Sequence, residues 1–257
     1  FAQPALIEPI ETVRYRYTLP RAKVNEYLAP GVFINYYLDN NEYKTVSISF
    51  FDEKGQLINS FTNETKDEID KSEYDMQLSR FTVIKTSNVT LNKGFNRFRW
   101  NLKHQGIVGK KKGKNLTGPL VKPGTYKVQI TLDGQQTLTD EIVVLKDPKT
   151  DTSEIALGEL EDFQLKLLDK IGEVNQLAEE MKTSIAKIKS KKRKTALLQS
   201  TLEQLETQEG TYMQPMLIDQ LRYLYSMTTR ADQILGQDAY DRYAELSAQF
   251  DEIKRQL

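Results

Sequence analysis

The first part of the chain alternates hydrophobic and polar residues. Five runs rich in β-branched and aromatic side chains show this pattern, at 13–17, 32–37, 46–50, 95–100 and 126–130. Successive side chains of a strand point to opposite faces, so the alternation predicts strands with one buried face. Between the runs lie turn-forming residues, at 29–31, 52–55, 92–94, 122–124 and 133–134. We therefore expect an antiparallel β-sandwich and not a doubly wound sheet.

The hydrophobic period changes after Asp147-Pro148. Two rows of hydrophobic residues then run side by side with a heptad spacing, and Gln164 interrupts the second: Leu160, Leu167, Val174, Met181 and Ile188, and Leu157, Ile171, Ala178 and Ile185. This spacing predicts one long helix with a hydrophobic seam. We expect Asp151 to cap its start and Glu154 to favour its positive end.

Three shorter helices are predicted after the long one. The first fits residues 196–206, with a face formed by Leu198, Leu202 and Leu205; Gly210 ends that stretch, Pro215 begins the next helix, and the last starts at about Asp238. Because the hydrophobic stripes must be buried, we expect a three- or four-helix bundle, with an extended coiled-coil hairpin of the first two helices as the alternative.

The patterns together predict an α+β chain with segregated domains. Residues 1–147 form the β-sandwich with an N-terminal extension, and residues 148–257 form the α-helical bundle. A chain of 257 residues is long enough for two such domains. The start lacks an initiator Met and a signal-peptide pattern, so we expect a piece of a larger protein.

Charge balance and composition limit the kinds of partner that the chain is expected to bind. Lys plus Arg equals Asp plus Glu, at 36 each, so no overall field attracts the chain to nucleic acid or to an anionic membrane. The sequence has no cysteine, and no run of about 18 apolar residues that could span a bilayer. We therefore predict neither a nucleic-acid partner nor a transmembrane segment.

Candidate catalytic and metal-binding residues are few. The single histidine, His104, follows a predicted strand, and no Gly-x-Ser-x-Gly motif supplies a nucleophile for it. One histidine without cysteine cannot form the usual zinc sites. The acidic stretch at 64–75 contains lysines and lacks a calcium-loop pattern. We therefore predict no catalytic, cofactor-binding or metal-binding residue and no cofactor.

Other candidate motifs also favour structural roles. The segment 109–115 departs from a phosphate-binding loop in spacing and in its last residue, and the basic run at 187–194 falls where the long helix should end. Trp100 and Tyr126 are expected in the core because both lie on predicted strands. Four tyrosines of the helical part could stack on sugars or pack between helices, namely Tyr223, Tyr225, Tyr240 and Tyr243.

Four segments of the β half resemble a known bacterial region: residues 29–38, 46–58, 94–102 and 118–128. Together they resemble the region that follows the β-propeller in secreted BNR-repeat, sortilin-like or "glycosyl hydrolase" proteins of bacteria. The sandwich is similar to the immunoglobulin-like domain of flagellar hook-capping (FlgD) proteins, which implies an antiparallel sandwich of the immunoglobulin or fibronectin type III kind. That family region often continues through an Asp-Pro pair into a helical bundle. Asn101 departs from the family, which more often has Asp after the Trp.

This resemblance implies a location outside the cytoplasm, secreted, periplasmic or at the cell surface, beside a preceding β-propeller of the same protein. Any hydrolase activity would then belong to the propeller. The expected function is a non-catalytic interaction or scaffolding region that binds protein. The alternative is a carbohydrate-binding module, which predicts exposed aromatic residues on one sheet face, with Tyr15, Tyr17, Tyr36 and Tyr37 as candidates. A third possibility is an active site shared with a missing domain.

Overall fold

The computed structural model describes residues 3–7, 11–14, 26–28, 31–63, 82–84, 89–108, 115–188 and 192–257, with backbone alone at 26–28, 82–84 and 192–194. The chain divides into two compact units, one of residues 1–105 and 120–154, the other of residues 106–119 and 155–257. The first is mostly β and the second contains four helices, as the change of hydrophobic period predicts. The segment 106–119 groups with the helices, although the sequence pattern placed it in the β part.

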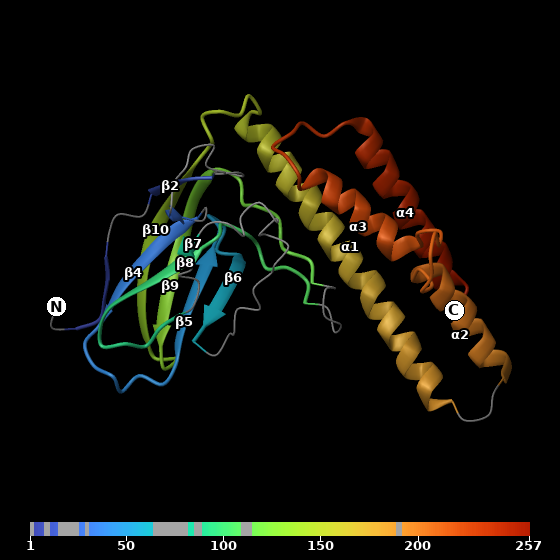
Figure 1. Ribbon diagram of the computed structural model, residues 1–257, viewed down its shortest axis with the longest axis horizontal. Helices are drawn as coiled ribbons and strands as arrows, with labels where there is room; N and C mark the ends of the chain where they lie inside the picture. Colours follow the sequence, from blue (N-terminus) through green and yellow to red (C-terminus); the bar gives the residue numbers. More distant parts are fainter. Residues whose placement is uncertain are drawn as a thin grey trace. The chain divides into compact units, whose positions relative to one another are not determined.

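The described residues of the first unit form ten strands in three sheets. The strands are β1 (Ala5–Ile7), β2 (Glu11–Val13), β3 (Glu26–Leu28), β4 (Val32–Leu38), β5 (Val46–Phe51), β6 (Leu57–Thr62), β7 (Thr82–Ile84), β8 (Gly94–Trp100), β9 (Gly124–Leu132) and β10 (Gln136–Leu145). One sheet has the order β1-β4-β8, the second β2-β10-β9-β5-β6, and β3 pairs with β7 (Figure 1).

Four of the predicted strands are confirmed as β4, β5, β8 and β9, and all pairings among the long strands are antiparallel. Residues 15–17 of the other predicted run lie outside the described residues. The expectation of purely antiparallel sheets is wrong, because β2 runs parallel to β10 and β3 runs parallel to β7. Alternation reports which face is buried and is the same for both strand directions, so it could not reveal these pairings.

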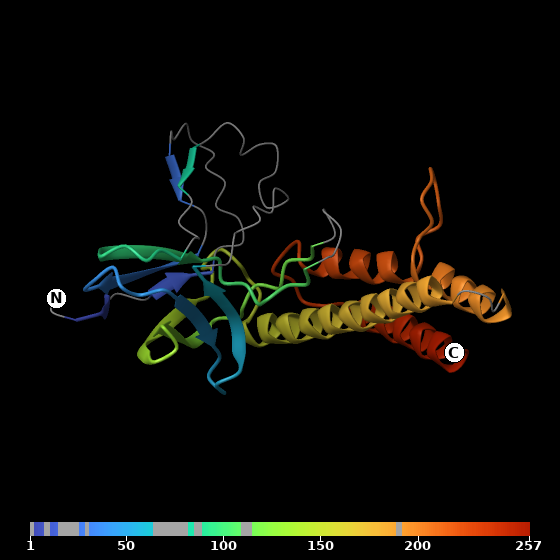
Figure 2. The same ribbon diagram turned by 90° about the horizontal axis from the view of Figure 1, so that it is seen from below.

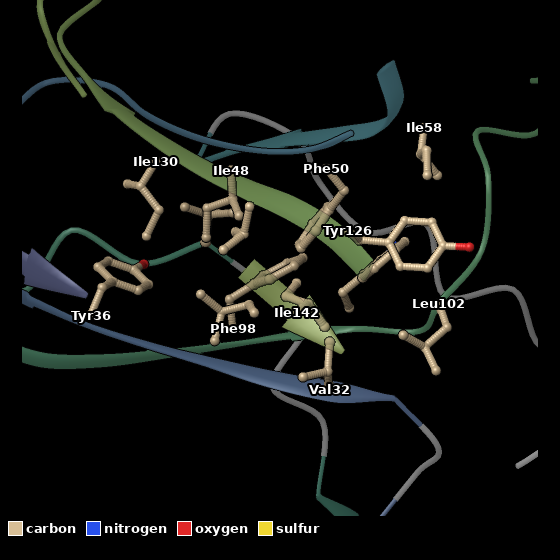
Figure 3. Close-up of a cluster of buried hydrophobic side chains, with 14 of the residues drawn as sticks. Val32, Tyr36, Ile48, Phe50, Ile58, Phe98, Leu102, Tyr126, Ile130 and Ile142 are labelled. Carbon is tan, nitrogen blue, oxygen red and sulfur yellow. The ribbon is translucent and has the colours of Figure 1, made fainter. Parts of the chain in front are cut away.

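The two larger sheets share one hydrophobic core. Every second side chain of β4 is buried, from Val32 to Leu38, and these residues cluster with the buried side chains of β5, β9 and β10 (Figure 3). Trp100 is fully buried at the centre, with its ring stacked 4.1 Å from that of Phe50. Its indole N–H donates to the carbonyl of Lys103 at 3.1 Å, so the buried polar atom is satisfied.

The β9–β10 hairpin turns at Asp133-Gly134, as the sequence predicts. Both residues have positive φ, 49° and 71°, which matches the primed turns that follow the twist of hairpin strands. The Asp133 carboxylate accepts hydrogen bonds from the backbone N–H groups of Thr45 and Lys44, at 2.8 and 2.9 Å. These two bonds lower the pKa of Asp133 because they stabilise its charged form.

The helices are α1 (Glu154–Lys187), α2 (Lys192–Leu205), α3 (Leu217–Thr228) and α4 (Gln237–Arg255), close to the predicted spans. All four contribute to a single hydrophobic cluster, and Figure 1 shows α2, α3 and α4 alongside α1. The predicted cap at Asp151 is wrong, because α1 begins at Glu154 and Ser153 precedes its first residue. The Lys146 ammonium donates to the carbonyls of Thr150 and Thr152 and holds this stretch outside the helix.

Gln164 explains the polar gap in the heptad pattern. Its side chain is buried, and its amide donates to the backbone carbonyl of Thr228 at 2.7 Å. Thr228 is the last residue of α3, where carbonyl groups have no partner within the helix. A polar residue therefore suits this position of the seam, because it gives the buried end of α3 its shorter hydrogen bond, beside a longer one of 3.3 Å from the Gln233 amide.

The described residues on either side of 109–114, namely 106–108 and 115–119, pack with the helices. Ile107 and Leu116 exchange two backbone hydrogen bonds of 2.8 Å, and both side chains pack on the helical cluster. The Tyr225 hydroxyl donates to the carbonyl of Thr117 at 2.7 Å. Gly106 fits because a Cβ there would lie 2.1 Å from the carbonyl oxygen of Leu116.

Candidate functional site

The aromatic residues of the β half that the sequence placed in the core are buried there. Trp100 and Tyr126 are both inaccessible, and the Tyr126 hydroxyl donates to the carbonyl of Lys122 at 2.7 Å. Tyr36 is also buried, and its hydroxyl donates to the carbonyl of Thr90 at 2.6 Å. Burial raises the pKa of Tyr36, so it remains a neutral hydrogen-bonding side chain. None of the three is open to a ligand.

The remaining candidates, His104 and three charged segments, lie in separate parts of the chain. His104 is half-buried in the segment after β8. The part of the chain that the structure describes contains no group of three His, Asp or Glu side chains able to hold a metal ion. The acidic stretch at 64–75 lies outside the described residues, and so do residues 109–114 of the glycine-flanked lysine segment. Helix α1 ends at Lys187, within the basic run, as expected.

The four tyrosines of the helical unit take different roles. Tyr225 is buried, and its hydroxyl donates to the carbonyl of Thr117. Tyr240 and Tyr243 pack edge-on against the ring of Phe163, with centroids 4.9 and 5.7 Å away. Tyr223 differs from the others, because 65% of its surface is exposed. It lies on the wall of a groove.

This groove lies between α3, the connection that follows it, and the first half of α4, and has a cavity volume of about 790 Å³. Its lining is Pro215, Asp219, Gln220, Tyr223, Leu224, Met227, Thr228, Gln233, Ile234, Leu235, Gly236, Asp238, Ala239 and Arg242. We call it the α3–α4 groove. Ligand sites commonly have volumes of about 300–1,000 Å³ and mostly apolar walls with a few polar groups, and this groove fits that description.

Helix periodicity explains how α3 lines the groove. The lining residues of this helix form two adjacent rows with a spacing of four, Asp219-Tyr223-Met227 and Gln220-Leu224-Thr228. Residues four apart lie on one helix face, so the groove extends along most of α3, which is about 18 Å long at 1.5 Å per residue. The opposite face of α3 is buried in the helical cluster.

Hydrogen bonds fix the two ends of the α3–α4 groove. At one end the Arg242 guanidinium donates to the side chain of Gln220 at 2.5 Å and to the Glu245 carboxylate at 2.8 Å. At the other end the Gln233 amide donates to the carbonyls of Met227 and Thr228, at 3.0 and 3.3 Å. These bonds connect α3 with α4 and with the intervening connection, so the walls are held in place without a ligand.

Exposed hydrophobic side chains gather at this groove. Tyr223, Met227 and Ile234 all line it, and Ile234 is 74% exposed. Next to Pro215, the connection from α2 to α3 presents a fully exposed Tyr212 and extends away from the helices as the orange loop in Figure 2. Clustered exposed hydrophobic residues are typical of binding surfaces. The sequence interpretation missed the groove, although the spacing of Tyr223 and Met227 indicates a second hydrophobic stripe on α3.

A second surface with aromatic residues lies on the outward face of the three-stranded sheet. Phe33 and Tyr37 of β4 and Phe95 of β8 share this face, because Tyr37 pairs with Phe95 and Phe33 is four residues from Tyr37. Phe95 is 70% exposed. The Tyr37 and Phe95 rings meet edge-on at 5.5 Å, and the Arg97 guanidinium lies 5.3 Å from the centre of the Phe33 ring. We call it the β4–β8 aromatic face.

Comparison with known proteins gives no relative from which a role could be transferred. No protein-family profile matches the sequence, and no curated protein is significantly similar to it. Within the described residues, no helix combines the length and the hydrophobicity needed to cross a bilayer. The two surfaces therefore have to be interpreted from their own chemistry.

Proposed function

We propose that this chain is a non-catalytic interaction region that binds a protein partner through the α3–α4 groove, with an immunoglobulin-like sandwich as its second part. The observation that carries the proposal is the groove itself, an open, mostly hydrophobic surface between two helices with Tyr223, Met227 and Ile234 exposed. Helical grooves of this kind commonly bind amphipathic segments of other proteins. Exposed methionine suits such surfaces because its flexible thioether adapts to different partners.

The immunoglobulin-like assignment is supported by strand order. In chain order, β4, β5, β6, β8, β9 and β10 would correspond to strands B, C, C′, E, F and G, since β4 and β8 share one sheet and β10-β9-β5-β6 follow one another in the other. Tyr126 near the start of β9, with its hydroxyl bonded to Lys122, resembles the tyrosine corner of that fold. Trp100 departs from the usual pattern because it lies on β8 instead of β5.

A location outside the cytoplasm, beside a β-propeller of the same protein, belongs to the same proposal. It is supported by the resemblance of residues 29–38, 46–58, 94–102 and 118–128 to propeller-flanking regions of secreted bacterial proteins. Fractionation of cells that express the full-length protein tests it. Recovery with a cytoplasmic marker instead of periplasmic or secreted markers would contradict this part of the proposal.

Site-specific photo-crosslinking tests the binding role of the groove. A photoreactive amino acid replaces Ile234 in the full-length protein, and the same replacement at Ile155 is the control, since both isoleucines are similarly exposed, at 74% and 78%, and Ile155 does not line the groove. We expect a distinct crosslinked protein from position 234 alone. The protein identified by mass spectrometry is then purified and its affinity is measured for wild type, Ile234→Ser and Ile155→Ser.

We expect Ile234→Ser to weaken this affinity by about tenfold or more, because hot-spot residues at the centre of an interface each contribute about 1–2 kcal/mol or more. Ile155→Ser should leave it unchanged. Equal binding by both variants, or the same crosslinks from both positions, would refute a binding role of the groove. Turnover of glycans by the purified chain would refute the non-catalytic part.

Carbohydrate recognition is the second candidate, and the β4–β8 aromatic face favours it. Sugars stack on open aromatic rings, yet Arg97 lies over the Phe33 ring and Tyr37 meets Phe95 edge-on. Phe95 therefore offers the most open ring of this face. A glycan array probed with wild type and with Phe95→Ala tests the candidate: signals that disappear in the variant support it, and an array without signals argues against it.

A further inference from the structure

The charges around the α3–α4 groove point to the chemistry of its occupant. Asp219 and Asp238 line the groove, each in the first turn of its helix. Arg242, the cation among the described lining residues, forms an ion pair with Glu245 at 2.8 Å. These four side chains carry a formal charge of −2, and the two helix N-termini offset about one unit of it. The groove therefore keeps a net negative charge of about one unit.

The carboxylates lie toward opposite ends of the groove. Asp219 lies at the end of the groove where α3 begins, next to Gln220, whose side chain accepts a hydrogen bond from Arg242. Asp238 is the second residue of α4 and follows the connection from α3 directly, so it lies toward the end where α3 finishes. Between them the wall is hydrophobic, formed by Tyr223, Leu224, Met227, Ile234, Leu235 and Ala239. An acidic group thus flanks each end of a hydrophobic strip.

We propose that the α3–α4 groove binds a short amphipathic helix of a protein partner whose hydrophobic face is flanked by lysine or arginine. Two observations select this occupant. The rows on α3 span residues 219–228, about 14 Å of helix, which matches two to three turns of a bound helix with anchors at i, i+4 and i+7. The acidic ends favour cations and disfavour an acidic segment.

This inference rests on the proposed function and adds the partner's chemistry to it. The test uses a displayed library of random helical peptides, selected on the purified complete chain. Enriched peptides are synthesised with a fluorescent label, and dissociation constants are measured by fluorescence anisotropy. We expect the enriched peptides to carry Lys or Arg flanking Leu, Ile, Phe or Met, and to lose affinity about tenfold or more with Ile234→Ser but not with Ile155→Ser.

Charge variants test the electrostatic part separately. The double variant D219N/D238N should weaken a cationic peptide roughly three- to tenfold and flatten the salt dependence of binding, as expected for two partly exposed ion pairs. Asp241→Asn is the matched control, because Asp241 lies on α4 outside the groove lining. D219K/D238K should reverse the preference toward acidic peptides. Circular dichroism melts confirm that each variant is folded.

The results separate the two proposals. Groove-dependent binding of peptides without any preference for Lys or Arg would overturn the cationic occupant and leave the binding role of the groove intact. Concentration-dependent dimers that Ile234→Ser dissociates would show that a second copy occupies the groove, which also overturns it. Selected peptides that bind Ile234→Ser as tightly as wild type would count against both proposals.

Discussion

Replacing Gly31 by alanine should destabilise the β unit far more than the same change at other glycines with positive φ. Gly31 has a φ of +137°, and a Cβ there would lie 2.2 Å from the carbonyl oxygen of Trp100. The next residue, Val32, pairs with Trp100 across β4 and β8. Real Cβ atoms essentially never come closer than 3.0 Å to another heavy atom, so the two strands would have to shift apart by about 0.8 Å. Their core side chains are fully packed, which opposes this shift.

The magnitude follows from two contributions. A φ of +137° lies outside the left-handed helical region and is rarely adopted by residues other than glycine, which costs alanine about 1–3 kcal/mol. Forcing atoms into a packed core costs about 1–3 kcal/mol, so Gly31→Ala should lose about 3 kcal/mol or more. Gly55 and Gly134 are matched controls, with φ of +77° and +71°, because a Cβ at either position would meet no atom within 4 Å beyond its chain neighbours. Alanine near the left-handed helical region costs about 1–2 kcal/mol, and no clash adds to this cost, so each control should lose about 1–2 kcal/mol.

Trp100 provides the assay, because it is the only tryptophan of the chain and lies in the β core. Its fluorescence during urea unfolding reports on the β unit, while circular dichroism at 222 nm follows the helices. With an m-value of about 2 kcal/mol/M, Gly31→Ala should lower the fluorescence midpoint by about 1.5 M. Midpoints for Gly31→Ala and Gly134→Ala that agree within about 0.3 M would refute the steric reasoning.

Three further predictions concern single hydrogen-bonding side chains. Tyr126→Phe should cost about 1 kcal/mol, because it removes a buried hydroxyl bonded to a carbonyl four residues upstream; unchanged urea stability by fluorescence would show that this bond contributes nothing. Gln164→Leu should lower helical stability by about 1–3 kcal/mol in thermal melts at 222 nm, since the Thr228 carbonyl loses its closest donor, whereas the exposed Gln176→Leu should change little. Asp133 has a folded pKa below its unfolded value of about 3.9, so its contribution to stability is complete above about pH 5 and is lost as the pH falls through the folded pKa. Wild type should therefore be more stable than Asp133→Asn at neutral pH and approach it in acid, and a difference that is independent of pH would contradict this.

Most features of the α3–α4 groove could not be predicted from sequence patterns. Helix spacing separates Tyr225, which lies four residues after the buried Leu221, from the exposed Tyr223, but it does not show whether the stripe of Tyr223 and Met227 is covered by another element. The groove depends on α3 and α4 meeting with the 229–236 connection between them, and on Arg242 reaching Gln220. Such contacts join residues far apart in the chain, and hydrophobic periodicity does not report which faces meet.

The sequence by itself determined the local structure. Alternation from Val32 to Leu38 and the heptad rows from Leu157 to Met181 identified strand and helix correctly, because burying one face imposes a period of two on a strand and about 3.6 on a helix. Turn residues such as Asp133-Gly134 determined where the chain reverses, because few residues tolerate positive φ.

Only the tertiary structure decided how these elements combine. It placed β2 parallel to β10, joined residues 106–119 to the helical unit, and gave Gln164 a partner at the end of α3. It also left the outer rows of α3 open as a groove with acidic ends. The physical reason is that burial periodicity is a local property, whereas pairing direction, hydrogen-bond partners and uncovered faces depend on contacts between distant segments.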